Sequence, residues 1–131
     1  MTPTIYIVDD EPDMAAILSE VAETVGLEVK VFHSALSFQQ KFIEKMPELI
    51  SMDISMPGMD GIELTQWLGK CKCTSEIIFI SGYEQFYLEL ASKFAEESHM
   101  NVVGCYAKPL RPSVFRKILQ KAISHKERVL N

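Results

Sequence analysis

The chain has little positive charge and no long apolar segment. Lysine and arginine total 13 residues against 18 aspartates and glutamates, which gives a net charge of -5. This shortage of cationic side chains disfavours nucleic acid as a direct partner, because phosphate binding needs clustered lysine and arginine. No apolar run approaches membrane-spanning length, and no basic segment followed by a long apolar stretch marks a secretion signal. We therefore expect a cytoplasmic protein that binds no membrane.

Cysteine is also scarce. The three cysteines, Cys71, Cys73 and Cys105, cannot all pair with one another. Cys71 and Cys73 form a Cys-x-Cys pair in a lysine-rich segment, without a nearby histidine or second cysteine pair that would complete a zinc site. We interpret all three as reduced thiols, and a redox role of the Cys71–Cys73 pair remains as an alternative.

The remaining composition is that of a globular domain, with 131 residues, 47% apolar and 24% charged. Five apolar or β-branched segments predict strands, and they alternate with helical patterns. The predicted strands span residues 4–8, 28–32, 49–53, 77–80 and 102–106. The first, third and fourth are almost continuously apolar, which is typical of central parallel strands covered on both faces.

Helical spacing of apolar residues fills the segments between these strands. The first predicted helix includes Pro12 in its first turn and is ended by Gly26. Ser37 opens the second as a capping residue, and that helix continues through Lys45. Asp60 caps the third, the fourth runs from about residue 84 to 98, and the fifth starts near residue 112. Strict alternation predicts an α/β domain with right-handed crossovers and a parallel sheet.

The last residues, HKERVLN, are polar. We expect them to form a fraying helix end or the start of a connection. The predicted domain therefore covers residues 1–125, and residues 126–131 form a tail or the start of a linker.

Charged and hydroxyl side chains stand where the predicted strands end. Asp9 and Asp10 follow the first strand, and Asp53 ends the third. Ser81 follows the fourth strand and Lys108 follows the fifth. Because open parallel sheets bind ligands at the carboxyl ends of their strands, we expect these side chains to meet along one edge. Such a concentration of negative charge is costly unless a metal ion or a phosphoryl group compensates it.

Two adjacent acids and a third from another strand suit a small hard cation, Mg²⁺ or alternatively Mn²⁺. Asp53 is the candidate nucleophile, because a carboxylate can accept a phosphoryl group as an acyl phosphate. The Lys108 ammonium could neutralise phosphoryl oxygens, and the Ser81 hydroxyl could donate a hydrogen bond to one of them. The added charge would make this edge a switch if a nearby group has two positions.

Other interpretations are available from the same residues. Asp9 and Asp10 could simply cap the first helix and complement its dipole. A metal-dependent phosphohydrolase could use the same acids, although no histidine or other general base accompanies them in the sequence. A third alternative is an interaction domain that works without phosphate. The histidines stand elsewhere in the sequence, at His33, His99 and His125.

Four short motifs occur in order and with suitable spacing. They are VDDE at 8–11, D-x-x-M-P-x-x-D-G at 53–61, SG at 81–82 and KP at 108–109. Each is weak alone, but the combination is highly specific. Over nearly all of its length the chain resembles the receiver domain of two-component response regulators.

The resemblance implies a flavodoxin-like, doubly wound (βα)5 fold with strand order 2-1-3-4-5. It implies that Asp53 accepts phosphate from a histidine kinase or a histidine phosphotransfer protein. Asp10 and Asp53 would bind Mg²⁺ directly and Asp9 through water, with the main-chain carbonyl of Ser55 as another ligand. Such a domain is a signalling element rather than an enzyme, and its chemistry is limited to its own phosphorylation and dephosphorylation. A cis peptide at Lys108–Pro109 is also implied.

Two departures from the family pattern concern the output. Cys105 occupies the usual place of the switch aromatic, three residues before the lysine, and Tyr106 should point to the other face of its strand. The segment from Ser81 to Lys108 is longer than in common receivers, which gives an extended fourth helix and the segment HMNVVGCYAKPL at 99–110. The latter segment is similar to receivers joined to EAL-type cyclic-di-GMP phosphodiesterase domains. We expect the face formed by the fourth helix, the last strand and the last helix to control partner binding, including homodimerisation. We expect either a stand-alone receiver or the front of a longer protein with an output domain beyond Asn131.

Overall fold

Five parallel strands form a single sheet at the centre of the computed structural model, which describes residues 2–55, 61–82 and 85–130. The spatial order is β2-β1-β3-β4-β5, which confirms the predicted fold class and strand order. The strands are β1 Thr4–Val8, β2 Glu28–Phe32, β3 Leu49–Asp53, β4 Glu76–Ser81 and β5 Asn101–Ala107. The first three have the predicted bounds, whereas β4 and β5 each extend one residue further at both ends.

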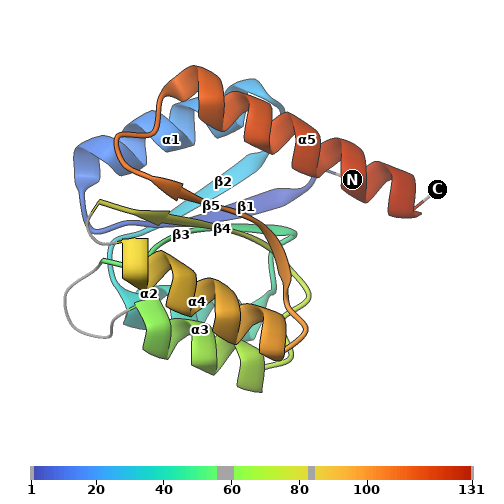
Figure 1. The fold of residues 1–131 in the computed structure, drawn as a ribbon. Coiled ribbons are helices and arrows are strands. Elements are labelled where there is room, and N and C mark those ends of the chain that lie inside the picture. The colour runs from blue at the N-terminus through green and yellow to red at the C-terminus, as the bar shows by residue number, and fades with distance from the viewer. Residues whose placement is uncertain (1, 56–60, 83–84, 131) are drawn as a thin grey trace.

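Five helices cover the two faces of the sheet. They are α1 Pro12–Thr24, α2 Ala35–Glu44, α3 Gly61–Lys70, α4 Gln85–Glu97 and α5 Pro112–Leu130. Helices α1 and α5 lie on one face, and α2, α3 and α4 lie on the other (Figure 1). None of the helices within the described ranges combines the length and the apolar character needed to span a membrane.

The alternation of side chains along the strands divides the core into two clusters. On β1, Tyr6 and Val8 pack with α2 and α3, while Ile5 and Ile7 pack with α1 and α5. All residues of β1, β3 and β4 are buried, as expected for central strands covered on both sides. This burial and the strand pairing fix the positions of the carboxyl ends of the three strands. Acids stand at the ends of β1 and β3, and Ser81 ends β4.

The ends of α1 and α2 show how far local signals specify the helix boundaries. Gly26 has a φ of +93° directly after the C-cap of α1, which agrees with the prediction that it ends this helix. The predicted cap of α2 was wrong: Ser34 is the N-cap, and its Oγ accepts the Ser37 N–H at 3.2 Å. Ser37 therefore lies inside the first turn, and the helix ends at Glu44, before the predicted Lys45. The predicted cap of α3, Asp60, lies outside the described residues.

Helices α3 and α4 end with left-handed residues that are not glycine. Lys72 follows α3 with a φ of 56°, and His99 follows α4 with a φ of 58°. In both cases the next residue donates its N–H to a carbonyl of the last turn, from Cys73 to Leu68 and from Met100 to Ala95. This is the hydrogen-bond pattern that also follows Gly26 after α1.

Helix α5 continues through Leu130 and runs past the end of the sheet (Figure 1). Residues 126–130 therefore extend the helix. The division of the chain into a domain at 1–125 and a tail at 126–131 stays a prediction.

Candidate functional site

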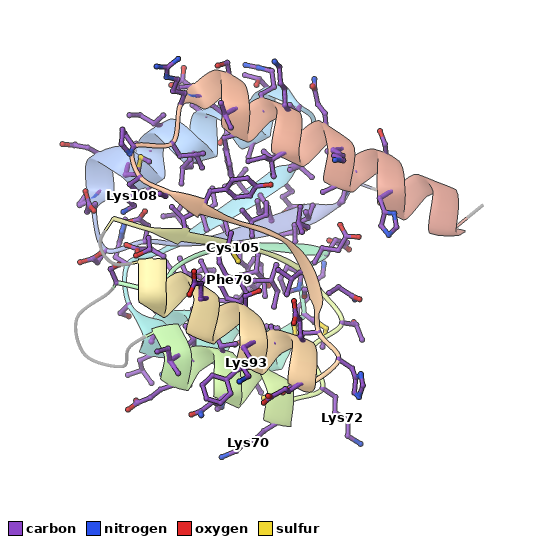
Figure 2. The ribbon with its side chains drawn as sticks, in the orientation of Figure 1. Lys70, Lys72, Phe79, Lys93, Cys105 and Lys108 are labelled. Atoms are coloured by element: carbon purple, nitrogen blue, oxygen red, sulfur yellow. The ribbon has the colours of Figure 1, made fainter. Side chains whose placement is uncertain are left out.

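The carboxyl ends of the strands bring the predicted charged residues together. Asp53 is the last residue of β3 and pairs in register with Ile80 of β4, so Ser81 lies one residue further along the neighbouring strand. Ligand oxygens of Asp9, Asp10, Glu11 and Asp53 lie within 4.8 Å of one another. The position of Lys108 beside the start of α1 is visible in Figure 2. Four carboxylates thus share one edge with one ammonium.

Lys108 is held by three of these carboxylates. Its Nζ lies 2.8 Å from Glu11 Oε1, 3.2 Å from Asp53 Oδ2 and 3.3 Å from Asp9 Oδ2. Burial alone would lower the pKa of the Lys108 ammonium, but the hydrogen bond to Glu11 and the charges of Asp53 and Asp9 outweigh it, so the pKa is raised. Lys108 is therefore a fixed positive charge at neutral pH.

The ionised forms of Asp9 and Asp10, which directly follow β1, are disfavoured by their surroundings. Burial raises the pKa of Asp9, and burial together with the charge of Asp53 raises the pKa of Asp10. Asp9 Oδ1 accepts the Glu11 N–H at 2.9 Å. Asp9 Oδ2 is buried and accepts no hydrogen bond from any described residue, although Lys108 lies close by. A buried, incompletely compensated carboxylate oxygen favours a bound cation.

The Asp53 carboxylate is oriented from both sides. Its Oδ1 accepts the Ser55 N–H at 2.9 Å, and its Oδ2 faces Lys108. The hydroxyls of Ser55 and Ser81 lie 2.9 Å apart. The backbone N–H of Lys108 donates to the backbone carbonyl of Ser81 at 2.8 Å. A pocket of about 480 Å³ opens beside this carboxylate. Its lining residues are Asp10, Glu11, Met14, Asp53, Ser55, Gly82, Lys108 and Pro109.

Comparison with known proteins identifies the family of this arrangement. The family model described as the response regulator receiver domain matches residues 5–120. The chain belongs to the response regulator receiver domain family. This confirms the resemblance found in the sequence.

Among curated proteins, the response regulator protein TmoT of Ectopseudomonas mendocina is 35% identical over 79 residues, which cover 60% of this chain and 36% of TmoT. The transcriptional regulatory protein FixJ of Bradyrhizobium diazoefficiens is 26% identical over 127 residues, which cover 94% of this chain and 58% of FixJ. The receiver thus spans less than two thirds of these relatives. The similarity to EAL-linked receivers stays a prediction.

Solved structures show the same fold over almost the whole chain. A CheY-like receiver domain protein from Methanospirillum hungatei JF-1 superposes with a TM-score of 0.80 at 26% identity, covering 98% of this chain and 99% of that one. A response regulator from Colwellia psychrerythraea gives a TM-score of 0.79, also at 26% identity, covering 95% of this chain and 99% of that one.

All the site residues named from the sequence lie at the acidic edge of the receiver. They are Asp9, Asp10, Asp53, Ser55, Ser81 and Lys108. Their chemical roles stay predictions.

Sequence reasoning missed three features of this edge. Glu11 was quoted only as part of a motif, yet it makes the shortest contact with Lys108. Its one signal in the sequence was its place directly after the acidic pair. The hydroxyl contact of Ser55 with Ser81 was not foreseen. His33 is also nearer than expected: its Nδ1 lies 3.0 Å from the main-chain oxygen of Asp9, although the ring contacts the backbone and not the carboxylates.

Strand β5, which precedes Lys108, carries the first departure from the family pattern, Cys105 in the usual place of the switch aromatic. Cys105 packs with the cluster beneath α4 (Figure 2). Tyr106 packs with the α1 and α5 cluster, so the two residues point to opposite faces as predicted. Tyr106 folds back over Gly104, where an added Cβ would lie 2.6 Å from the tyrosine Oη. The peptide at Lys108–Pro109 is cis, as the family resemblance implied.

No disulfide joins Cys71, Cys73 and Cys105, all of which lie within the described residues. Burial raises the pKa of the Cys105 thiol, which disfavours the reactive thiolate. This agrees with the interpretation of Cys105 as a reduced thiol.

Proposed function

We propose that this receiver domain accepts a phosphoryl group on Asp53 from a phosphohistidine of a sensor histidine kinase or a histidine phosphotransfer protein. The aspartyl phosphate then changes the binding of a partner or the activity of an output domain. The observation that carries this proposal is the environment of Asp53, whose carboxylate is almost fully buried but adjoins a pocket and lies 3.2 Å from the Lys108 ammonium.

The groups around Asp53 suit an in-line transfer. An oxygen of the Asp53 carboxylate attacks phosphorus, the P–N bond of the phosphohistidine breaks, and its electron pair remains on the imidazole nitrogen. The Ser55 N–H fixes one carboxylate oxygen, which orients the other toward the pocket side. Lys108 offsets charge on the phosphoryl oxygens as a point charge, and the Ser81 hydroxyl donates to one of them.

Magnesium fits the donor set of this edge, because Asp9 Oδ2 is buried without a hydrogen-bond donor among the described residues. Asp10 and Asp53 would hold the ion directly and Asp9 through water, with the main-chain carbonyl of Ser55 as a further ligand. When bound, the ion offsets the repulsion between the acids and the incoming phosphoryl group. We expect Mn²⁺ to substitute for it.

The proposal predicts a covalent adduct at one residue. Incubation with a small phosphodonor and Mg²⁺ should add one phosphoryl mass to the chain, as an acid-stable and base-labile adduct, because an acyl phosphate is cleaved by hydroxide. Mass spectrometry should place the adduct on Asp53. Asp53→Asn should abolish it, whereas Asp13→Asn, which changes an exposed acid in the first turn of α1, should retain it. If neither small donors nor a cognate kinase modify the wild-type chain, the proposal is wrong.

The proposal also covers the enzymatic activity, the location and the output surface of the domain. Catalysis by this domain is limited to its own phosphorylation and dephosphorylation, so multiple-turnover hydrolysis of an external phosphoester would contradict it. Unchanged partner affinity with a phosphoryl mimic would instead support an interaction domain that works without phosphate. A cytoplasmic location, the absence of direct nucleic-acid contacts and a further output domain are parts of this proposal. The output surface would be the face formed by α4, β5 and α5, with homodimerisation as one response.

A further inference from the structure

Three carboxylates surround the Lys108 ammonium. Its Nζ donates hydrogen bonds to Glu11 Oε1 at 2.8 Å and to Asp53 Oδ2 at 3.2 Å, and it forms an ion pair with Asp9 Oδ2 at 3.3 Å. A phosphoryl oxygen that approaches this ammonium therefore competes with these carboxylates for its positive charge and its three N–H donors. Identifying the carboxylate that leaves identifies a residue that controls the transfer.

Two of the three carboxylates cannot leave easily. The side chains of Asp9 and Asp53 are each only 2% exposed, and each has its second oxygen fixed by a backbone N–H. A carboxylate that lost its lysine there would remain buried and uncompensated, which is costly. Asp9 and Asp53 are therefore retained when the phosphoryl group arrives.

Glu11 differs in its exposure. Its side chain is 62% exposed, and its carboxylate makes the shortest contact with Lys108, at 2.8 Å. Since it lies at the surface, a released Glu11 carboxylate is solvated by water at little cost. Glu11 also lines the pocket beside Asp53, so its charge lies on the approach path of an anionic phosphodonor.

We propose that Glu11 is a positioning residue for the phosphotransfer, which holds the Lys108 ammonium in the free receiver and is displaced by a phosphoryl oxygen. This inference rests on the proposed function of Asp53 and adds a group that competes with the phosphoryl for Lys108. The competition slows phosphorylation and weakens binding of phosphoryl analogues. Glu11 thereby sets how readily the domain is switched on.

The test compares Glu11→Gln with the wild-type chain and with Asp13→Asn. Asp13 is an exposed acid two residues further along, so its substitution removes the same charge from the start of α1. We expect Glu11→Gln to bind beryllofluoride with Mg²⁺ about 2- to 5-fold more tightly, the range for an exposed ion pair. The initial rate of phosphorylation by a small phosphodonor should rise by a similar factor, and Asp13→Asn should change neither. Calorimetry measures the first quantity and mass spectrometry the second.

Two further measurements distinguish competition for Lys108 from a role of Glu11 in metal binding and from a general effect of charge. The advantage of Glu11→Gln should shrink with added sodium chloride, because salt screens an exposed ion pair. The affinity for Mg²⁺ alone should stay within about twofold, within the range of a screened, exposed charge. A fall in both Mg²⁺ affinity and phosphorylation rate would overturn the proposal, since Glu11 would then act with the metal. Equal gains in Glu11→Gln and Asp13→Asn would overturn it too, because the effect would be one of general charge.

Failure of this inference can be told from failure of the proposed function. A wild-type chain that is phosphorylated on Asp53, with a Glu11→Gln variant that behaves identically, contradicts only the role of Glu11. A wild-type chain that neither becomes phosphorylated nor binds beryllofluoride contradicts the function of Asp53, and the role of Glu11 with it.

Discussion

The carboxyl groups of Asp9 and Asp10 make the free energy of unfolding depend on pH. Burial raises the pKa of both carboxyl groups, and the charge of Asp53 adds to the effect at Asp10. The folded-state pKa therefore lies above the unfolded value of about 3.9. The contribution of these groups to stability is fully present below the unfolded pKa and is lost as the pH rises through the folded pKa.

Removing one of the two charges should therefore stabilise the apo domain at neutral pH. We expect Asp10→Asn to raise the midpoint of thermal unfolding by about 2–4 °C near neutral pH in a chelating buffer, and to change it little below the ordinary pKa of aspartate. Added Mg²⁺ should stabilise the wild-type chain more than the variant, because the variant lacks a ligand. Calorimetric scans across this pH range measure both effects. An Asp10→Asn difference that does not vary with pH would contradict the argument.

The individual residues of the site differ in how well the sequence predicts them. Asp53, Ser81 and Lys108 were predictable, because each ends or follows a strand and the carboxyl ends of parallel strands meet. Glu11 was not, since its contact with Lys108 joins side chains 97 positions apart and depends on their rotamers. Nothing in local spacing distinguishes a glutamate that points to solvent from one that reaches across the pocket.

At the level of elements, helix ends were predicted only where a residue type carries a backbone preference. Gly26 was foreseen as a terminator, but Lys72 and His99 occupy the same left-handed position without any sequence signal. The cap of α2 was misplaced because two serines stand three residues apart, and hydroxyl chemistry alone does not choose between Ser34 and Ser37. The bounds of the central strands were predicted more accurately than the helix ends, because strands buried on both faces are continuous apolar runs in the sequence.

The strained helix ends lead to a stability prediction. Lys72→Gly and His99→Gly should each raise the free energy of unfolding by about 0.5–1 kcal/mol, because glycine adopts a positive φ without steric cost. Gly26→Ala should lower it by about 1 kcal/mol. A Cβ at Gly26 would have no neighbour within 4 Å, so only the backbone conformation contributes. Urea unfolding measures all three, and a destabilised Lys72→Gly variant would show that the lysine side chain matters more than its backbone.

For the whole molecule, alternation of strands and helices was sufficient to predict the fold class, but not how a signal leaves it. A groove of about 960 Å³ lies between β5 and α5 and includes Lys117 and Lys121. Exposed acids stand on the neighbouring α4, among them Glu96 and Glu97. Helices α4 and α5 lie on either side of the edge strand β5. Acids on one of these helices and lysines on the other suit a symmetric pairing of two copies along this edge.

Together with the proposed function, this arrangement predicts a dimer whose formation depends on the phosphoryl state. Light scattering should show an increase toward twice the monomer mass with beryllofluoride and Mg²⁺. Lys121→Glu should weaken that association by about 5- to 10-fold, because it places like charges together. Lys70→Glu, at the end of α3 away from α5 (Figure 2), is the matched control and should have no effect. An unchanged mass for the wild-type chain would remove dimerisation as the output.

The position of the single tryptophan has a practical consequence. The Trp67 ring is half-buried and packs against the apolar layer between α2, α3 and the sheet. It lies edge-on to Phe38 and Phe42, with ring centroids 6.5 and 5.5 Å away. Its fluorescence therefore reports on the packing of this layer. A change in the emission spectrum on adding a phosphodonor would mean that the packing of Trp67 against Phe38 and Phe42 had changed. An unchanged spectrum of a chain shown to be phosphorylated would place the conformational response in other parts of the domain.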